Sequence, residues 1–168
     1  MISLPRGVMP GGSDPAVAAA PHGDARYAAY TTHRPAAAHA DIVVTASGDR
    51  GQTWATPVTA TPHDEVIYFQ PNLAADHTGQ IGISAFALAH RRVNHVLLLS
   101  RPHQLRFAAP RQVTTAPFDP HSPTEPGKHG TWWIGDYQGI TASAGAFHLV
   151  WNDTRTGKLD LFAATVHP

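Results

Sequence analysis

The sequence predicts an all-β protein assembled from repeats of a four-stranded antiparallel unit. Its 168 residues include 14 glycines and 15 prolines, a composition typical of many short strands joined by turns. Short apolar runs, rich in β-branched and aromatic residues, are bounded by these turn residues along the chain. The same order of strand and turn patterns then recurs, which indicates an internal repeat.

The first repeat contains four predicted strands. A strand of small residues precedes a turn around Gly23, and the second strand ends at Tyr30. The polar, alanine-rich stretch 31–40 is expected to form a longer loop before two further strands. The four strands are expected at 14–19, 26–30, 41–45 and 55–59.

An octapeptide at 47–54, Ser-Gly-Asp-Arg-Gly-Gln-Thr-Trp, connects the third strand to the fourth. Asp49 can accept hydrogen bonds from backbone N–H groups two or three residues on, and Gly51 can adopt a positive φ. Trp54 is expected to fold over the turn and bury its ring. We therefore predict a structural role, and no catalytic one, for Ser47, Asp49, Gly51 and Trp54.

The second repeat reproduces the first, and a third copy follows with one strand fewer. Gly79 and Gly145 take the place of Gly23 in the turn between the first two strands. Segment 100–107 resembles a degenerate copy of the octapeptide, since it keeps the serine and ends on an aromatic residue. The strands of these two repeats are expected at 70–75, 81–86, 95–100, 110–114, 135–142, 147–151 and 159–164.

Repeats of four short strands, spaced along the chain as Gly23, Gly79 and Gly145 are, are typical of β-propeller blades. A β-sandwich also has short and regular strands, but the internal repeat argues against it. The sequence thus predicts a single domain that is a partial propeller of about three blades. Its expected segments are a stray outer strand at 1–12, a blade at 13–61, a second blade at 62–117 and a three-stranded blade at 131–168.

Three blades are too few to close a ring, since propellers have about 4–8. Residues 4–8 resemble the strand at 110–113, so they are expected to be the outer strand of a preceding blade, in phase to complete the third. Either the chain is the C-terminal half of a six-bladed protein whose N-terminal half is missing, or two chains form a homodimer that closes one ring. The first alternative is favoured.

The composition excludes several classes of site. Charged residues make up 14% of the chain and the formal net charge is zero, so neither nucleic acid nor a membrane surface is expected as a partner. No cysteine is present, and the 12 histidines form no HExxH pattern. We therefore expect no metal and no cofactor, and we expect most histidines at the surface. No apolar run reaches the roughly 18 residues of a spanning helix, and the first residues lack a signal-peptide pattern.

The octapeptide resembles the Asp-box of the sialidase and BNR-repeat proteins, which are β-propellers. The runs Gly-Asp-Tyr-Gln-Gly at 135–139 and Val-Trp-Asn-Asp-Thr-Arg-Thr-Gly at 150–157 resemble those near the C-terminus of bacterial exo-sialidase-like proteins. The resemblance implies a secreted protein that hydrolyses terminal sialic acids with retention. Such enzymes use an arginine triad, a tyrosine nucleophile activated by a glutamate, and an aspartate as acid and base.

These catalytic residues do not map onto the chain one by one. Its candidate phenols are Tyr68 and Tyr137, and its only glutamates are Glu65 and Glu125. No evident triad is formed by the arginines Arg26, Arg34, Arg91, Arg92 and Arg155. We therefore do not expect the chain alone to be a competent sialidase.

Ligands of propellers bind at one mouth of the central channel, beside the first strands. This position directs attention to Asp14, to 68–72 and to 132–137, where aromatic rings, amides and carboxylates could hold a sugar. The predicted glycan-binding residues are Trp132, Trp133, Asp136, Tyr137, Tyr68, Asn72 and Arg155. In the alternative interpretation the two tryptophans pack between blades, Asp136 caps a turn and Arg155 shapes a hairpin.

Three functional hypotheses remain from the sequence. The first is a sialidase-like propeller that acts on or binds glycans, and the second is a non-catalytic propeller that serves as a scaffold for protein or carbohydrate binding. The third is a truncated reading frame without a function of its own. A tyrosine–glutamate pair and at least two arginines at one mouth would favour the hydrolase, whereas arginines dispersed over the rim would argue against it.

Overall fold

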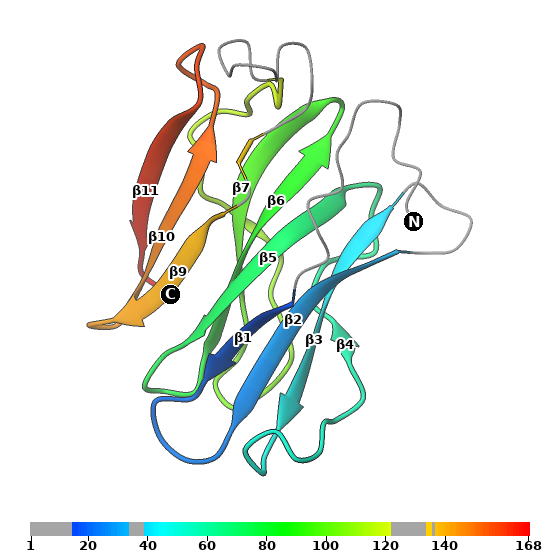
Figure 1. Cartoon of the computed structure of the whole chain (residues 1–168), viewed down its shortest axis with the longest axis vertical. Helices are drawn as coiled ribbons and strands as arrows, with labels where there is room; N and C mark the ends of the chain where they lie inside the picture. The colour runs from blue at the N-terminus through cyan, green and yellow to red at the C-terminus, as the bar shows by residue number, and fades with distance from the viewer. Residues whose placement is uncertain (1–14, 34–38, 122–133, 136) are drawn as a thin grey trace.

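The computed structural model describes residues 15–33, 39–121, 134–135 and 137–168, which form eleven strands in three antiparallel sheets and no helix (Figure 1). Blade 1 comprises β1 (Ala16–Ala19), β2 (Arg26–His33), β3 (Ala40–Ser47) and β4 (Val58–Thr59). Blade 2 comprises β5 (Ile67–Ala75), β6 (Ile81–Ala89), β7 (Arg92–Leu99) and β8 (Arg111–Gln112). Blade 3 comprises β9 (Gly139–Ser143), β10 (Ala146–Asp153) and β11 (Asp160–Val166). The all-β prediction is confirmed, and the stray strand expected at 1–12 lies outside the described residues.

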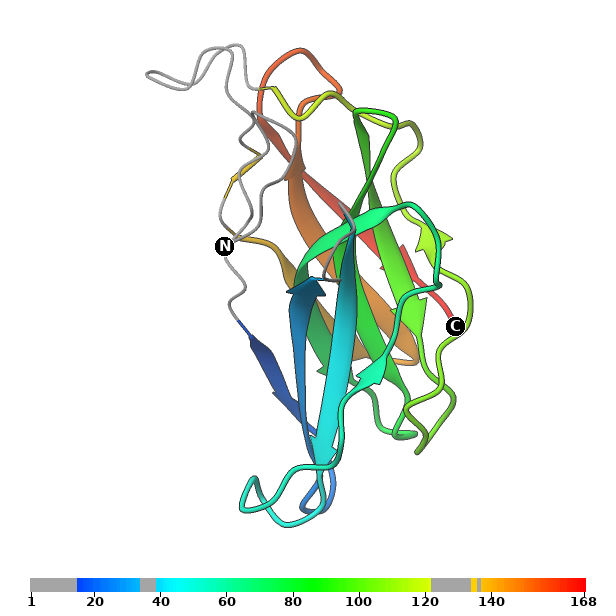
Figure 2. The ribbon, with the colours of Figure 1, turned by 90° about the vertical axis from the view of Figure 1, so that its right-hand side faces the viewer.

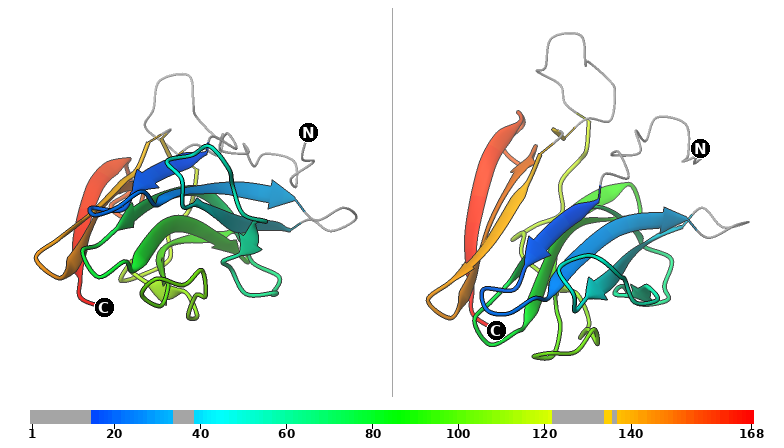
Figure 3. Two further views of the ribbon diagram at one scale, coloured as in Figure 1. Left: turned by 90° about the horizontal axis from the view of Figure 1, so that it is seen from below. Right: turned by 60° about the horizontal axis from the view of Figure 1, so that its bottom comes forward.

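The three sheets are arranged as a fan with blade 2 in the middle (Figure 3). The first strands β1, β5 and β9 lie side by side and run in the same direction (Figure 1). The strands follow the long axis of the molecule, so the turns between them gather at its two ends (Figure 2). We call the end where the first strands begin the mouth.

Strand β6 shows how the sequence holds the fan together. Because side chains alternate between the two faces of a strand, Ile83 and Ala85 enter a core shared with blade 1. Phe86 and Leu88 enter a second core shared with blade 3. Both faces of this strand are therefore buried.

The repeat in the sequence is also a repeat in the structure. Each fourth strand pairs with the third strand of its own blade in the same register, at Val43↔Thr59 in blade 1 and at Val96↔Gln112 in blade 2. Just before it, the N–H of Ala55 donates to the carbonyl of Ala46 at 2.9 Å. The equivalent bond in blade 2 joins Ala108 to Leu99 at 3.0 Å.

Several strand boundaries differ from the sequence prediction; β9, for example, begins at Gly139 and not at 135. The loop expected at 31–40 is shorter, because β2 continues to His33 and β3 begins at Ala40. Strand β5 begins at Ile67, before the predicted 70, and the pairing register of β5 with β6 shifts between Phe69 and Asn72. Gln70 lies in this bulge with a φ of 48°, a backbone that periodicity alone does not reveal.

Phe118 lies outside the strands that the sequence predicts, yet the structure gives it a defined place. The structure pairs it with Val93 through two backbone hydrogen bonds of 2.9 Å. Its ring is fully buried in the core between blades 2 and 3. The segment after β8 therefore covers the start of β7.

No helix among these residues is long and apolar enough to cross a membrane.

Candidate functional site

Amide side chains connect the first strands of blades 2 and 3 at the mouth. Asn72 donates through Nδ2 to the carbonyl of Gln138 at 2.8 Å, and Gln70 donates through Nε2 to the carbonyl of Gly135 at 3.2 Å. The side chain of Gln138 donates in return to the carbonyl of Gln70, which the bulge in β5 makes available. Asn72, predicted to bind a ligand, thus uses its N–H group to hold blade 3.

Gly135 is required where it stands. Its φ is 92°, and a Cβ atom there would lie 2.4 Å from Nδ2 of Asn152. A side chain at this position would therefore meet backbone strain, and the amide of Asn152 would have to move aside.

Tyr137 is the exposed aromatic residue of the mouth. Its side chain is 87% exposed, and it precedes the Gln138 that anchors β9. An exposed aromatic ring is a surface on which a sugar ring can stack, with the phenol hydroxyl as a hydrogen-bonding group. The other predicted site residues of this stretch, Trp132, Trp133 and Asp136, lie outside the described residues, as do Asp14 and Glu125.

Tyr68 is not arranged as a nucleophile. The residue is 4% exposed and packs in the core between blades 1 and 2. Its hydroxyl donates to Oδ2 of Asp64 at 3.1 Å, so its carboxylate partner is Asp64 and not Glu65. Burial, followed by the nearby charges of Asp64 and Asp41, raises the pKa of Tyr68 well above its usual range. The phenol therefore stays protonated at neutral pH.

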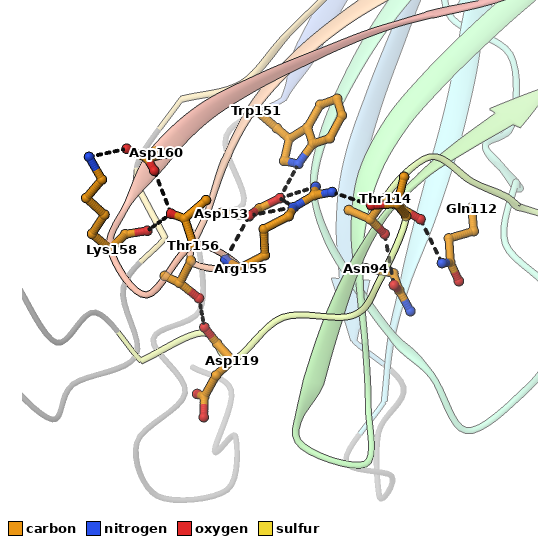
Figure 4. Close-up of polar contacts among 12 residues, drawn as sticks. Asn94, Gln112, Thr114, Asp119, Trp151, Asp153, Arg155, Thr156, Lys158 and Asp160 are labelled. Atoms are coloured by element: carbon orange, nitrogen blue, oxygen red, sulfur yellow. Dashed lines mark hydrogen bonds and ion pairs between the residues drawn. The ribbon is translucent and has the colours of Figure 1, made fainter.

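Arg155 is held by a fully buried carboxylate (Figure 4). Its Nε lies 2.8 and 3.0 Å from the two oxygens of Asp153, and Oδ2 of the same carboxylate accepts the indole N–H of Trp151 at 3.0 Å. The guanidinium lies 4.1 Å from the ring centre of Phe162 and donates to the hydroxyl of Thr115 at 2.9 Å. These contacts tie the β10–β11 hairpin to the segment after β8, which is the structural alternative for Arg155.

His95 belongs to the same contact between blades 2 and 3, although most histidines were expected at the surface. Its ring stacks on Trp151 with centroids 4.7 Å apart and planes at 7°, and it meets Phe86 edge-on at 5.0 Å. Both ring nitrogens are buried without a hydrogen-bond partner. Burial lowers the pKa of His95 to about 3, partly opposed by the charge of Asp153. The sequence does contain an indication of this burial. His95 lies two positions from Val93 and two from Leu97, so it shares their face of the strand.

Three of the described candidate arginines lie in turns at the mouth end. Arg91 and Arg92 are exposed at the β6–β7 turn, and Arg155, at the start of the β10–β11 turn, is held by the buried carboxylate of Asp153. Arg26, in contrast, donates to the carbonyl of Ala25 at 2.9 Å, in the turn at the opposite end. Arg34 lies outside the described residues. Because Asp153 occupies Arg155 and the carboxylate partner of Tyr68 is an aspartate, the described residues do not form the arrangement that would favour a sialidase.

The octapeptide forms a hydrogen-bonded turn at the end opposite the mouth. The hydroxyl oxygen of Ser47 accepts the N–H of Gly51 at 2.7 Å, and the carboxylate of Asp49 accepts the N–H and hydroxyl of Thr53 at 2.8 and 2.6 Å. The hydrogen bonds that the carboxylate of Asp49 accepts, that from the Thr53 hydroxyl first, lower the pKa of Asp49 to about 2. Trp54 donates to the carbonyl of Gly51 at 3.1 Å, but its ring stays 43% exposed and is not buried as predicted.

Two other kinds of site were searched for in the described part of the chain. A shallow cleft of about 380 Å³ lies between 59–62 and 105–109, on the outer rim of blades 1 and 2 and away from the predicted site residues. No three histidine, aspartate or glutamate side chains among these residues come together to hold a metal ion.

The fan of sheets defines a partial β-propeller. Among solved structures, the chain is similar to the catalytic domain of the Coprinopsis cinerea GH62 alpha-L-arabinofuranosidase, with a TM-score of 0.52 and 13% identity. The match covers 92% of this chain and 45% of that structure, so the chain spans less than half of the neighbour's length. At this identity the similarity shows the fold alone. That neighbour has a five-bladed, propeller-like fold, so six blades remain a prediction.

No protein-family model matches the chain, and no curated protein sequence matches it either.

Proposed function

We propose that the chain is part of a propeller that binds glycans at its mouth. The observation that carries this proposal is Tyr137, an almost fully exposed aromatic ring beside the amide cluster that begins β9. The Tyr137 ring offers an apolar face on which a sugar ring can pack, and its hydroxyl supplies a polar end. The similarity to a propeller glycosidase supports a carbohydrate as that partner.

The finer proposal is that the glycan carries sialic acid. Its support is the resemblance of the octapeptide, and of the runs at 135–139 and 150–157, to sialidase-like proteins. Against hydrolysis by this chain stand the protonated, buried Tyr68 and the engagement of Arg155 by Asp153. We therefore propose binding without turnover, which keeps the non-catalytic scaffold as the form that this function takes.

Titration calorimetry with a sialylated trisaccharide and with an arabinose-containing oligosaccharide would test both the binding of a glycan and the preference for sialic acid. We expect the sialylated trisaccharide to bind, and we expect Tyr137→Ala to weaken that binding about tenfold, which corresponds to a loss of about 1.4 kcal/mol. Binding of the arabinose-containing sugar alone would contradict the preference for sialic acid and keep the site at the mouth. Trp54→Ala is the matched control, because this exposed aromatic residue lies at the opposite end. Equal losses in both variants would contradict a site at the mouth.

A fluorogenic sialoside separates binding from hydrolysis. We expect no turnover above background by the wild-type chain. Turnover that survives in Tyr68→Phe would show that another nucleophile is at work, and turnover lost in this variant would contradict the structural role of Tyr68.

A further inference from the structure

Blade 3 has one sheet face that looks away from the rest of the described chain. Phe147, Leu149 and Trp151 of β10 enter the core shared with blade 2. The residues between them point the other way, and so do their partners on β9 and β11. This outer face of blade 3 includes Thr141, His148, Val150, Leu161, Ala163 and Thr165.

The composition of this face is that of a covered surface. Leu161 is 70% exposed, yet none of the residues that β9, β10 and β11 turn outward is acidic or basic apart from His148. Solvated sheet faces are normally polar, whereas the centres of protein interfaces are depleted in charge.

His148 fits the same interpretation. Its two ring nitrogens lie 2.9 Å from the hydroxyl of Ser143 and 3.0 Å from that of Thr165. These three polar side chains satisfy one another within the sheet, so a partner could cover them without leaving the imidazole unpaired.

Blade 1 has the corresponding face on the other side of the fan. Tyr27 and Ala29 of β2 point towards blade 2, so Ala28 and Tyr30 point away from it. Val17, which pairs with Ala28, is 65% exposed.

Charge lies only at the two ends of this outer face of blade 1, and in both places it is already engaged. Asp41 is buried and accepts the hydroxyl of Thr61 at 3.0 Å, and Arg26 donates to the carbonyl of Ala25. The middle of the face is therefore uncharged, like the outer face of blade 3.

Within the chain, each interface between blades joins one face of a blade, here called its rear face, to the opposite face of the next blade, here called its front face. Blade 2 supplies one of each through the alternate residues of β6. Among the described strands, the front face of blade 1 and the rear face of blade 3 take part in no contact between blades, although Val43 and Thr45 of β3 in the first of these are already buried. These two faces are the two halves of the same kind of interface, and a second copy of the chain presents both.

We propose that two copies of this chain associate head to tail, so that the outer face of blade 3 in each copy packs on the outer face of blade 1 in the other. The two equivalent interfaces close one ring of six blades with twofold symmetry, within the range of about 4–8 blades that propellers adopt. This assembly goes beyond glycan binding and does not depend on it.

Light scattering on a sizing column measures the expected change. The wild-type chain elutes at twice its mass of 18.0 kDa. Ala163→Arg, in the centre of one face, and Val17→Arg, in the centre of the other, each elute at the mass of one chain. Both positions are exposed, so circular dichroism should show unchanged folding. Ala109→Arg, exposed in the loop before β8, is the matched control and stays a dimer.

Mixing the two variants tests the head-to-tail arrangement. The Val17→Arg chain keeps an intact outer face on blade 3, and the Ala163→Arg chain keeps an intact outer face on blade 1. We expect an equimolar mixture to recover a heterodimer through one interface, captured by a tag on one variant.

Four results would overturn the proposal. A monomeric wild-type chain would show that these faces do not pair, and would leave them to further blades of a longer polypeptide. A dimer that survives Ala163→Arg would use another surface. A dimer that survives Val17→Arg but not Ala163→Arg would join two copies of blade 3 face to face. Species larger than a dimer would show that the ring does not close.

Discussion

The carboxylate of Asp153 shows how one residue can connect two blades. It is fully buried and accepts hydrogen bonds from Trp151 and Arg155. Arg155 in turn reaches Thr115, beyond the end of blade 2. A buried carboxylate is tolerated only when its oxygens are satisfied in this way, so the sequence Trp-Asn-Asp-Thr-Arg is better explained by packing than by ligand binding.

We therefore predict that Asp153→Asn destabilises the protein by about 3–5 kcal/mol, because the cation of Arg155 loses its buried partner. Urea unfolding followed by circular dichroism measures the change. Asp160→Asn is the control, since Asp160 pairs with Lys158 at the surface, and its effect should be much smaller. Equal effects of the two substitutions would mean that the buried pair contributes no more than a surface pair.

His95 predicts a pH dependence at the same contact. The unfolded chain takes up a proton near the ordinary histidine pKa of about 6.5, whereas burial holds the pKa of His95 in the fold at about 3. The contribution that the neutral His95 ring makes to the free energy of unfolding is therefore fully present above about pH 6.5. It is lost as the pH falls towards 3, by up to about 1.4 kcal/mol per pH unit.

His95→Phe keeps an aromatic ring between Trp151 and Phe86 but removes the titration. Its unfolding free energy should fall less steeply than that of the wild type between about pH 6.5 and pH 4. His77→Phe, at an exposed turn position, should keep the wild-type slope. Parallel curves for His95→Phe and the wild type would contradict a neutral, buried His95.

At the scale of elements, the turn at 47–54 depends on Ser47 as much as on the acidic residue that defines the motif. Ser47 is 1% exposed, and its hydroxyl oxygen accepts the N–H groups of Asp49 and Gly51 at 3.3 and 2.7 Å. Removing this oxygen leaves two backbone donors without their partner in a partly buried turn.

We predict that Ser47→Ala destabilises the protein by about 1–3 kcal/mol, the usual consequence of an unpaired buried group. Ser84→Ala is a matched control, because Ser84 is also fully buried but its hydroxyl has no partner. That substitution should be neutral or stabilising. A larger loss at Ser84 than at Ser47 in urea unfolding would show that packing, and not hydrogen bonding, decides both sites.

The sequence predicted the elements well because both of its signals were local. Alternating apolar residues and turn glycines such as Gly23 and Gly145 mark strands without reference to the rest of the fold. The bulge at Gln70 and the buried position of Phe118 could not be predicted in this way. Each depends on a neighbour that lies far along the chain, Gln138 in one case and Val93 in the other.

The candidate site was harder to predict. The residue types at Tyr68, Asn72 and Arg155 suit ligand binding, yet each side chain has a partner inside the protein. The partner of Asn72 lies in another blade, whereas Asp64 and Asp153 are only 4 and 2 residues from Tyr68 and Arg155. In all three cases the residue types alone do not show whether the side chain turns to a partner within the protein or to a ligand. Tyr137 remains the predicted site residue that the structure leaves exposed.

At the scale of the whole molecule, blade 2 couples the other two. Ile83 and Phe86 are only three positions apart on β6, but one packs against blade 1 and the other against blade 3. Because the two faces of this strand belong to different cores, the loss of either core would expose one face of β6 to water. We therefore expect the three blades to unfold together, as nearest-neighbour contacts dictate in repeat architectures.

Two cavity-forming substitutions test this coupling. Ile83→Ala should destabilise the protein by about 2–5 kcal/mol and Phe86→Ala by about 3–5 kcal/mol. Both should shift the same single transition, seen at one urea concentration by tryptophan fluorescence and by circular dichroism. Val58→Ala, at a partly exposed position, should change stability by less than about 0.5 kcal/mol. All variants must be compared at one protein concentration, because pairing of two chains would itself raise the midpoint. Separate transitions, with Ile83→Ala moving one and Phe86→Ala the other, would show that the two cores unfold independently and that β6 does not connect them.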